Sequence, residues 1–212
     1  VRLYVYAHSL FKLHPGFDKT LGKLLRRDPD GRLIIVDDQA DGHWTKLILE
    51  RFHRSFPDVA GHVISIPRLP TEKFIGLLTI ADALLDNPFI SGTSAGLVSL
   101  GVAAPIVAWP GELCSGRCVT ACYKQMGLSD LIATDEESFL KLVLRLAQDS
   151  DFKQRIQSDI KANAHKLYER LEVVREMEDF FITAHEAWKT GDTLTEWSYP
   201  SHTRSPSYQG AQ

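Results

Sequence analysis

Five consecutive small or hydroxylated residues follow a short apolar run and precede a predicted helix. They are Gly92, Thr93, Ser94, Ala95 and Gly96. Backbone N–H groups and hydroxyls in such a turn approach an anion closely, and the first turn of the next helix adds partial positive charge. The turn therefore suits a phosphate or diphosphate group. The same residue types also form tight turns and helix caps, so this second interpretation stays open.

A cationic side chain lies in the loop after the first apolar run of the chain. The ammonium of Lys12 there could neutralise the charge that develops on a diphosphate leaving group, although a lone lysine is usually a solvated surface residue. His8 lies at the same strand end, and it is either a hydrogen-bonded structural residue or a general base.

Another loop carries Ser115 and Arg117 just before a predicted helix at residues 114–126. The guanidinium of Arg117 either contacts phosphate or pairs with a carboxylate such as that of Glu112. If the strands before these loops are neighbours, the loops face one crevice.

Short apolar runs typical of buried strands alternate with segments of helical period. Strands are predicted at residues 2–7, 33–36, 62–66, 83–85 and 105–109, with helices between them. This alternation predicts an α/β fold with a doubly wound parallel sheet and helices on both faces. Ligands of such sheets bind beyond the carboxyl ends of the strands, where the candidate residues lie.

The pattern after residue 132 is wholly helical. We predict one domain over residues 1–188, in which these C-terminal helices pack as a lid or as a return arm. Residues 189–212 are rich in Thr, Ser, Pro and Gly without a period, which predicts a disordered tail. The chain opens on Val1 and enters a strand at once, so we expect it to be an excerpt of a longer protein.

Charge and composition exclude several classes of protein. The formal net charge is -3, so no basic field exists to attract nucleic acid or anionic lipid. No apolar run approaches the roughly 20 residues of a membrane span. Three cysteines at a spacing of four, Cys114, Cys118 and Cys122, are expected to be reduced, small core residues in a cytoplasmic protein. We predict no metal site.

Four segments, in chain order, resemble motifs of the O-GlcNAc transferase-like family of glycosyltransferases, which includes SPINDLY. They are FKLHP at residues 11–15, LDNP and GTSAG within residues 85–96, PGE with Ser115 and Arg117 within residues 110–117, and GL with LIA within residues 127–133. The resemblance covers residues 4 to about 181. It implies the C-terminal, Rossmann-like domain of a two-domain GT-B enzyme that binds a UDP-sugar donor.

The resemblance also implies roles for single residues. Lys12 would contact the donor diphosphate and act in catalysis, with Ser9 near the same pocket. Arg68 and Leu69 would lie in the loop that reads the uracil edge. Phe74 would stack on the base, although an aromatic residue at helical spacing is also typical of a core. The remaining implied donor-binding residues are Gly92, Thr93, Ser94, Ala95, Gly96, Ser115 and Arg117.

The implied reaction is inverting, metal-independent and cofactor-free transfer of GlcNAc or a hexose from a UDP-sugar to a protein side chain. The implied partners are a protein acceptor and a missing N-terminal half, which in this family can carry helical repeats. Two departures weaken the expected grip on the ribose: Val98 stands where the family has a carboxylate, and Thr71 where it has a lysine.

Three other functions stay open. The chain could be a catalytically degenerate donor-binding or scaffold module, which Val98 and Thr71 favour modestly. It could be another sugar-nucleotide enzyme such as an epimerase. An NAD-binding protein is disfavoured because no G-x-G-x-x-G follows a strand.

Overall fold

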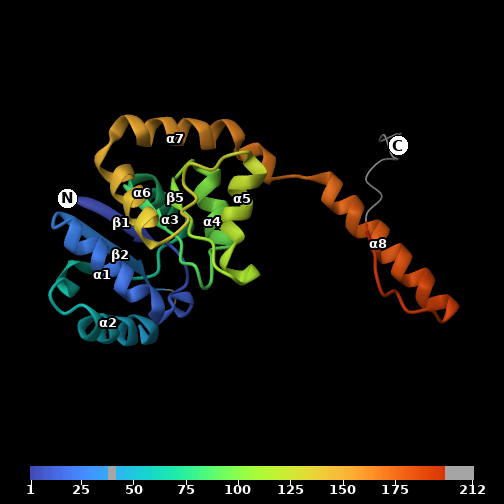
Figure 1. Ribbon diagram of the computed structural model, residues 1–212, viewed down its shortest axis with the longest axis horizontal. Helices are drawn as coiled ribbons and strands as arrows, with labels where there is room; N and C mark the ends of the chain where they lie inside the picture. The colour runs from blue at the N-terminus through green and yellow to red at the C-terminus, as the bar shows by residue number, and fades with distance from the viewer. Residues whose placement is uncertain (38–41, 199–212) are drawn as a thin grey trace. The chain divides into compact units, whose positions relative to one another are not determined.

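The computed structural model describes residues 1–37 and 42–198 (Figure 1). The chain divides into two compact units, of which the first is Val1–Tyr168 and the second begins at Glu169. Each unit is described by itself. No helix in the described part of the chain combines the length and the apolar character needed to cross a membrane.

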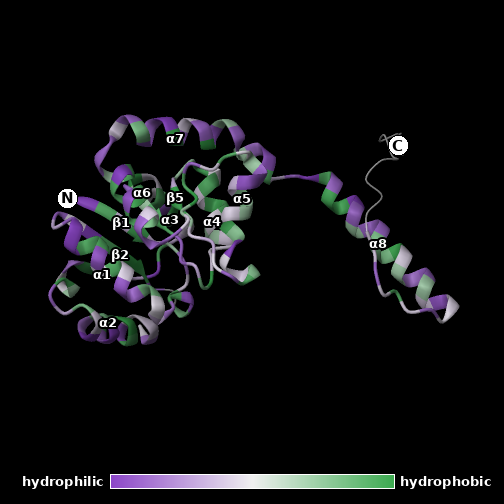
Figure 2. Cartoon of the chain, in the orientation of Figure 1, coloured by the Kyte–Doolittle hydropathy of each residue, from purple (hydrophilic) through white to green (hydrophobic). Residues whose placement is uncertain are grey.

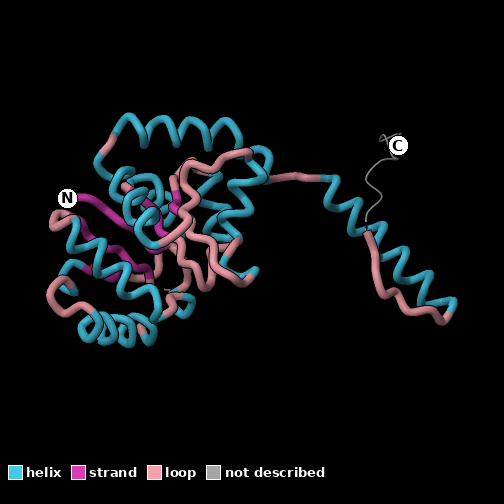
Figure 3. The backbone as a smooth tube through the Cα atoms, viewed as in Figure 1, coloured by secondary structure: helices cyan, strands magenta, loops and turns pink. Residues whose placement is uncertain are grey.

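The first unit is built on one parallel sheet of five strands. The strands are β1 (Arg2–Tyr6), β2 (Gly31–Val36), β3 (Val63–Ile66), β4 (Ala83–Leu85) and β5 (Ile106–Val107). Their order in the sheet is β3-β2-β1-β4-β5, and each pair of neighbours is parallel. Figure 3 shows the strands at the centre of this unit with helices around them. The predicted doubly wound α/β fold is confirmed.

Helices cover both faces of the sheet. They are α1 (Asp18–Arg27), α2 (His43–Ser55), α3 (Thr71–Ile80), α4 (Ser94–Gly101), α5 (Cys118–Met126), α6 (Glu136–Gln148) and α7 (Ser150–Asn163). Helix α1 packs against α2 and α6, whereas α4 packs against α3, α5 and α7 (Figure 1). The chain moves to one side of the sheet from β1 to β2 and to the opposite side from β4 to β5. With right-handed crossovers, the helices that follow β1 and β4 therefore lie on opposite faces of the sheet.

Short 3-10 helices fill several of the connections. They are η1 (Leu10–Lys12), η2 (Pro15–Phe17), η3 (Ala60–His62), η4 (Cys114–Gly116) and η5 (Ala164–Leu167). The first two follow β1 and η4 follows β5, so both of these loops at the carboxyl edge of the sheet have a defined shape.

The core explains why the strands are continuous apolar runs. Tyr4, Val5 and Tyr6 of β1 have no exposed surface, because helices cover both sides of the sheet. The helices turn their apolar stripes inward and their polar residues to solvent (Figure 2). Helix α6 begins with a capping box in which Asp135 and Ser138 bond each other's backbone amides.

Several element bounds differ from the sequence predictions: β5 keeps only Ile106–Val107 of the predicted strand 105–109, β2 begins two residues earlier than predicted, and two helices differ as well. The helix expected from residue 114 begins only at Cys118, because the chain first makes the 3-10 turn η4. Helix α8 (Leu171–Thr190) extends two residues past the predicted domain boundary. Residues 191–198 have no regular secondary structure, and the rest of the predicted tail lies outside the described residues.

Candidate functional site

The strand order reverses between β1 and β4. The chain runs from β1 through β2 to β3 and then returns to β4 on the other side of β1. In open α/β sheets this is the point at which ligands bind, beyond the carboxyl ends of the strands. The loop that carries Lys12 follows β1, and the turn Gly92–Gly96 follows β4. These two predicted segments therefore lie at the same edge, on neighbouring strands.

Buried Asn87 ties the two loops together. Its Nδ2 donates to the Tyr6 hydroxyl at 2.9 Å, to the Lys12 carbonyl at 3.4 Å and to the Ile90 carbonyl at 2.9 Å. Its Oδ1 accepts from the amides of Phe89 and Ile90. The sequence analysis missed Asn87, although a polar residue soon after a buried apolar strand is a signal that could have found it.

The loop after β5 joins the same cluster through backbone contacts. The Ser91 amide donates to the Ser115 carbonyl at 2.8 Å, and the Val119 amide donates to Ser91 Oγ at 3.1 Å. Gly111 and Gly116 lie directly on the Pro88 carbonyl, since a Cβ on either would come within 1.7 Å or 2.1 Å of that oxygen. Only glycine permits this approach, and the loops after β4 and β5 are thereby held in one arrangement.

The turn Gly92–Gly96 presents unbonded backbone amides. Thr93 is the N-cap of α4 but makes no side-chain capping bond. The first amide of α4 that finds a backbone acceptor is that of Leu97, which bonds the Thr93 carbonyl at 3.0 Å. Within the described residues, the amides of Ser94 and Ala95 have no acceptor, as is usual in the first turn of a helix. Thr93 and Ser94 are exposed, so an anion can reach them.

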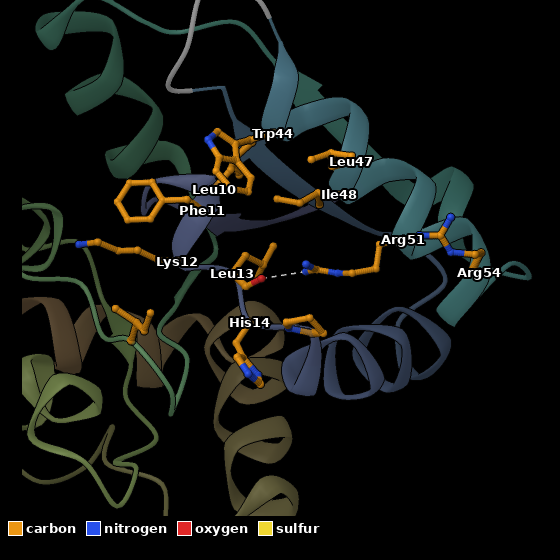
Figure 4. A pocket seen from close by; sticks show the side chains of 12 residues that line it. Leu10, Phe11, Lys12, Leu13, His14, Trp44, Leu47, Ile48, Arg51 and Arg54 are labelled. Carbon is orange, nitrogen blue, oxygen red and sulfur yellow. Dashed lines mark hydrogen bonds between the residues drawn. The ribbon is translucent and has the colours of Figure 1, made fainter.

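Lys12 is half-buried and forms no ion pair with any residue that the structure describes. Its ammonium lies 6.0 Å from the centre of the Phe11 ring. In Figure 4 the side chain extends away from Leu13 and Arg51. Burial raises the pKa of the Cys118 thiol at the start of α5, as do Asp86 and Cys114, and the Lys12 ammonium acts in the opposite direction. Lys12 is therefore close enough to α5 to influence charge there. Ser9, half-buried, accepts the Lys12 amide on its carbonyl.

Arg51 of α2 braces the Lys12 loop from the other side. Its Nη2 donates to the Leu13 carbonyl at 2.9 Å, shown as the dashed line in Figure 4, and its guanidinium pairs with Asp18 at 2.8 Å. Burial raises the pKa of Asp18, and Arg51 opposes that shift. A cavity of about 380 Å³ lies between this loop and α2, beside the rings of Phe11 and Trp44 (Figure 4). Sequence reasoning had no signal for this brace, because it depends on how α2 packs.

Arg117 has a structural partner that the sequence analysis did not foresee. Its Nε donates to the Gly111 carbonyl at 2.7 Å, and its Nη2 donates to the backbone carbonyl of Glu112 rather than to that residue's carboxylate. Ser115 Oγ donates to the Phe89 carbonyl at 3.2 Å. Both side chains therefore stabilise the loops of the site, and their predicted contact with phosphate stays a prediction.

The residues predicted to bind the base lie farther along the same edge. Arg68, Leu69 and Phe74 follow β3, two strands from β1, or about 10 Å at the usual strand spacing. Phe74 is half-buried and packs against the hydrophobic core, so the alternative of a core role has direct structural support. Its predicted stacking on a base stays a prediction. Val98 is 39% exposed on α4, and Thr71 is exposed at the start of α3.

The three cysteines do not form the buried set that we expected. Cys114 is exposed, while Cys118 and Cys122 are half-buried, and all three are free thiols. The expectation fails because η4 turns Cys114 outward before α5 begins. Within residues 1–37 and 42–198, no group of three or more His, Cys, Asp and Glu side chains is arranged to hold a metal ion.

Comparisons with known proteins agree with this fold. The chain is 22% identical over 188 residues to the UDP-N-acetylglucosamine–peptide N-acetylglucosaminyltransferase of Caenorhabditis elegans, covering 87% of this chain but 16% of that protein. It is similar in structure to a mutant O-GlcNAc transferase of Thermobaculum terrenum, with a TM-score of 0.77 and 18% identity over 90% of this chain and 37% of that one.

A third similar structure is Anabaena HepE in complex with UDP and glucose, with a TM-score of 0.58 and 12% identity over 84% of this chain and 47% of that one. The chain thus spans only a small part of the relatives that it matches. The sequence model of glycosyltransferase family 41 matches residues 3–176, which is most of the first unit and the beginning of the second. The chain belongs to glycosyltransferase family 41.

Proposed function

We propose that the chain is the donor-binding half of an inverting glycosyltransferase that moves GlcNAc or a hexose from a UDP-sugar to a protein side chain. The observation that carries this proposal is the position of the Lys12 loop beside the turn Gly92–Gly96 at the switch point of the sheet. An ammonium without an ion pair and backbone amides without acceptors are what a diphosphate requires.

The proposed role of these groups is to stabilise the leaving group. As the bond between the sugar and UDP breaks, negative charge grows on the diphosphate oxygens. The Lys12 ammonium, the amides of Ser94 and Ala95 and the dipole of α4 are positioned before the reaction to meet that charge. The acceptor nucleophile attacks the anomeric carbon from the opposite face, which inverts its configuration. In this proposal no metal ion or other cofactor is needed for UDP to leave.

The rest of the parent protein would supply the acceptor site. The C. elegans relative is by name a peptide N-acetylglucosaminyltransferase, and this chain corresponds to only 16% of it. Helix α8 has no buried residue and exposes apolar side chains that include Met177, Phe181 and Ile182. We propose that the N-terminal half covers this face. A cytoplasmic location, expected from the reduced thiols, stays a prediction.

One observation favours a second candidate, a degenerate donor site in a scaffold module. Val98 and Thr71 are both exposed, so packing in the core does not explain why they stand in place of the implied carboxylate and lysine. The lost carboxylate and lysine would weaken the hold on the ribose. Membership of family 41 leaves the epimerase and NAD-binding alternatives without support.

Calorimetric titration of the 212-residue chain with UDP separates these candidates. We expect wild type to bind UDP, and Lys12→Ala to weaken the affinity at least tenfold, which is about 1.4 kcal/mol. Lys19→Ala is the matched control, because Lys19 is exposed on α1 and follows no strand end. In the full-length parent, Lys12→Ala should reduce turnover far more than stability. No binding at millimolar UDP would favour the scaffold, and unchanged turnover would remove Lys12 from the mechanism.

A further inference from the structure

A histidine is buried where β1 ends, and neither nitrogen of its ring is hydrogen-bonded. His8 is 3% exposed, and both Nδ1 and Nε2 lack a hydrogen-bond partner among the described residues. Nε2 lies 3.1 Å from Asp86 Oδ1, an ion-pair distance, but its alignment is outside hydrogen-bond geometry. An unsatisfied buried polar group costs about 1–3 kcal/mol. An apolar residue would avoid that cost, so the polar ring requires an explanation. Its burial favours the structural interpretation of His8 over a role as general base.

The carboxylate beside His8 shapes the turn that follows β4. Asp86 is 1% exposed, and its Oδ2 accepts from Ser91 Oγ at 2.6 Å while its Oδ1 accepts from the Gly92 amide at 2.9 Å. The Ser91 hydroxyl in turn accepts the Val119 amide of α5. One buried carboxylate thus fixes both residues that lead into Thr93 and α4. A buried carboxylate is costly unless polar groups surround it, and the His8 ring, at ion-pair distance, adds a polar neighbour to the two donors that Asp86 already has.

The imidazole is also in direct contact with the turn. A Cβ on Gly92 would lie 2.0 Å from Cε1 and 2.3 Å from Nδ1 of His8. The ring packs edge-on against Tyr6, with centroids 5.1 Å apart. Gly92 is therefore held by contact with the His8 ring and by the hydrogen bond from its amide to the Asp86 carboxylate.

We propose that His8 and Asp86 form a positioning pair that holds the turn Ser91–Thr93 in the shape needed to bind a nucleoside diphosphate. This inference rests on the proposed function, and it adds two residues that need not touch the ligand. The pair connects the end of β1, which leads to Lys12, with the start of α4, whose amides are unbonded. It keeps the cation and the amides in fixed relative positions, so that neither must reorganise when the diphosphate binds.

Substitutions at His8 separate this role from simple packing. His8→Phe keeps a ring but removes the polar nitrogen that faces Asp86, whereas His8→Gln keeps an N–H donor near the position of Nε2. His165→Phe is the matched control, because His165 is exposed in η5. Dissociation constants for UDP and for uridine, which lacks the diphosphate, are measured by calorimetry on the full chain, together with thermal unfolding of each variant.

We expect His8→Phe to raise the Kd for UDP at least tenfold, to leave the Kd for uridine unchanged, and to affect UDP more than His8→Gln does. If His8→Phe does not fold, Asp86→Asn provides the same test, because it keeps an acceptor for the Gly92 amide but removes the charge. Equal UDP affinity of wild type and these variants would overturn the pair while leaving the proposed function intact. His8→Gln binding UDP more weakly than His8→Phe would show that the ring only fills space. A wild-type chain that binds no UDP would overturn both proposals.

Discussion

Gly116→Ala adds only one methyl group, but it should disrupt the packing of the loops that form the site. The new Cβ would come within 2.1 Å of the Pro88 carbonyl oxygen, whereas Cβ atoms essentially never lie within 3.0 Å of such an atom. The loops after β4 and β5 must then separate by about 1 Å, the difference between 3.0 and 2.1 Å. That movement would strain or break the bond from the Ser91 amide to the Ser115 carbonyl.

The expected cost combines two effects. Overpacking a buried position costs about 1–3 kcal/mol, and each backbone hydrogen bond that is lost adds about 1 kcal/mol. Together they destabilise the first unit by about 2–4 kcal/mol. For a chain of this size, each kcal/mol lowers Tm by about 2–4 °C, so Gly116→Ala should melt about 4–16 °C below wild type. UDP binding should weaken as well, because the turn Ser91–Thr93 is bonded to the displaced loop.

Gly76→Ala is the matched control, since no atom lies within 4 Å of its new Cβ and the residue is exposed inside α3. Alanine is a better helix former than glycine, so this variant should gain about 0.5–1 kcal/mol and melt slightly above wild type. Differential scanning calorimetry measures both changes. If Gly116→Ala is as stable as Gly76→Ala, the close contact between the two loops does not exist in solution.

Three further predictions concern other parts of the chain. Arg2 and Tyr4 hold the pKa of Asp28 below its ordinary value of 3.8, so this carboxylate stabilises the fold above about pH 4 and loses that effect as the pH falls through its lowered pKa. Asp28→Asn should therefore destabilise the chain in urea at neutral pH, and the loss should shrink as the pH is lowered below about 4. A loss of stability that does not change over this acid range would contradict the shift. Mass spectrometry after brief alkylation should find Cys114 modified first, because burial raises the pKa of Cys118 and Cys122, and faster labelling of Cys122 would refute this order. Within residues 1–188, limited trypsin digestion should cut first after Arg170 or Arg175, because α8 has no buried residue, and an early cut inside the first unit would argue against the division at Glu169.

Much of the fold could be predicted because its signals are local. The apolar run 83–85, the glycines of the next turn and the helix from Ser94 follow one another in the chain, and each has a short-range cause. The predicted start of a helix at residue 114 was wrong because contacts within the preceding loop override the local helical pattern. Arg117 takes its backbone carbonyl partners from Gly111 and Glu112, and this loop structure delays the helix to Cys118.

The candidate site was only partly predictable. Lys12 and the turn Gly92–Gly96 stand out by residue type, but the side chains that connect their loops do not. Asn87, Arg51 and His8 are common residue types, and the partners through which they connect the loops (Tyr6, Lys12, Leu13 and Asp86) lie 38 to 81 positions away. No periodicity or motif marks such contacts.

The amino-acid sequence by itself determined which segments become strands, helices and small-residue turns, because these depend on side-chain period, on glycine and proline and on the first residues of each helix. Only the tertiary structure decided that β4 lies beside β1, and hence that the Lys12 loop meets a turn 80 residues later. It also decided that the Pro88 carbonyl packs against Gly111 and Gly116 and that His8 is buried against Gly92. The physical reason is that packing joins groups by distance in space, and a side chain's partner is set by the whole sheet rather than by its neighbours along the chain.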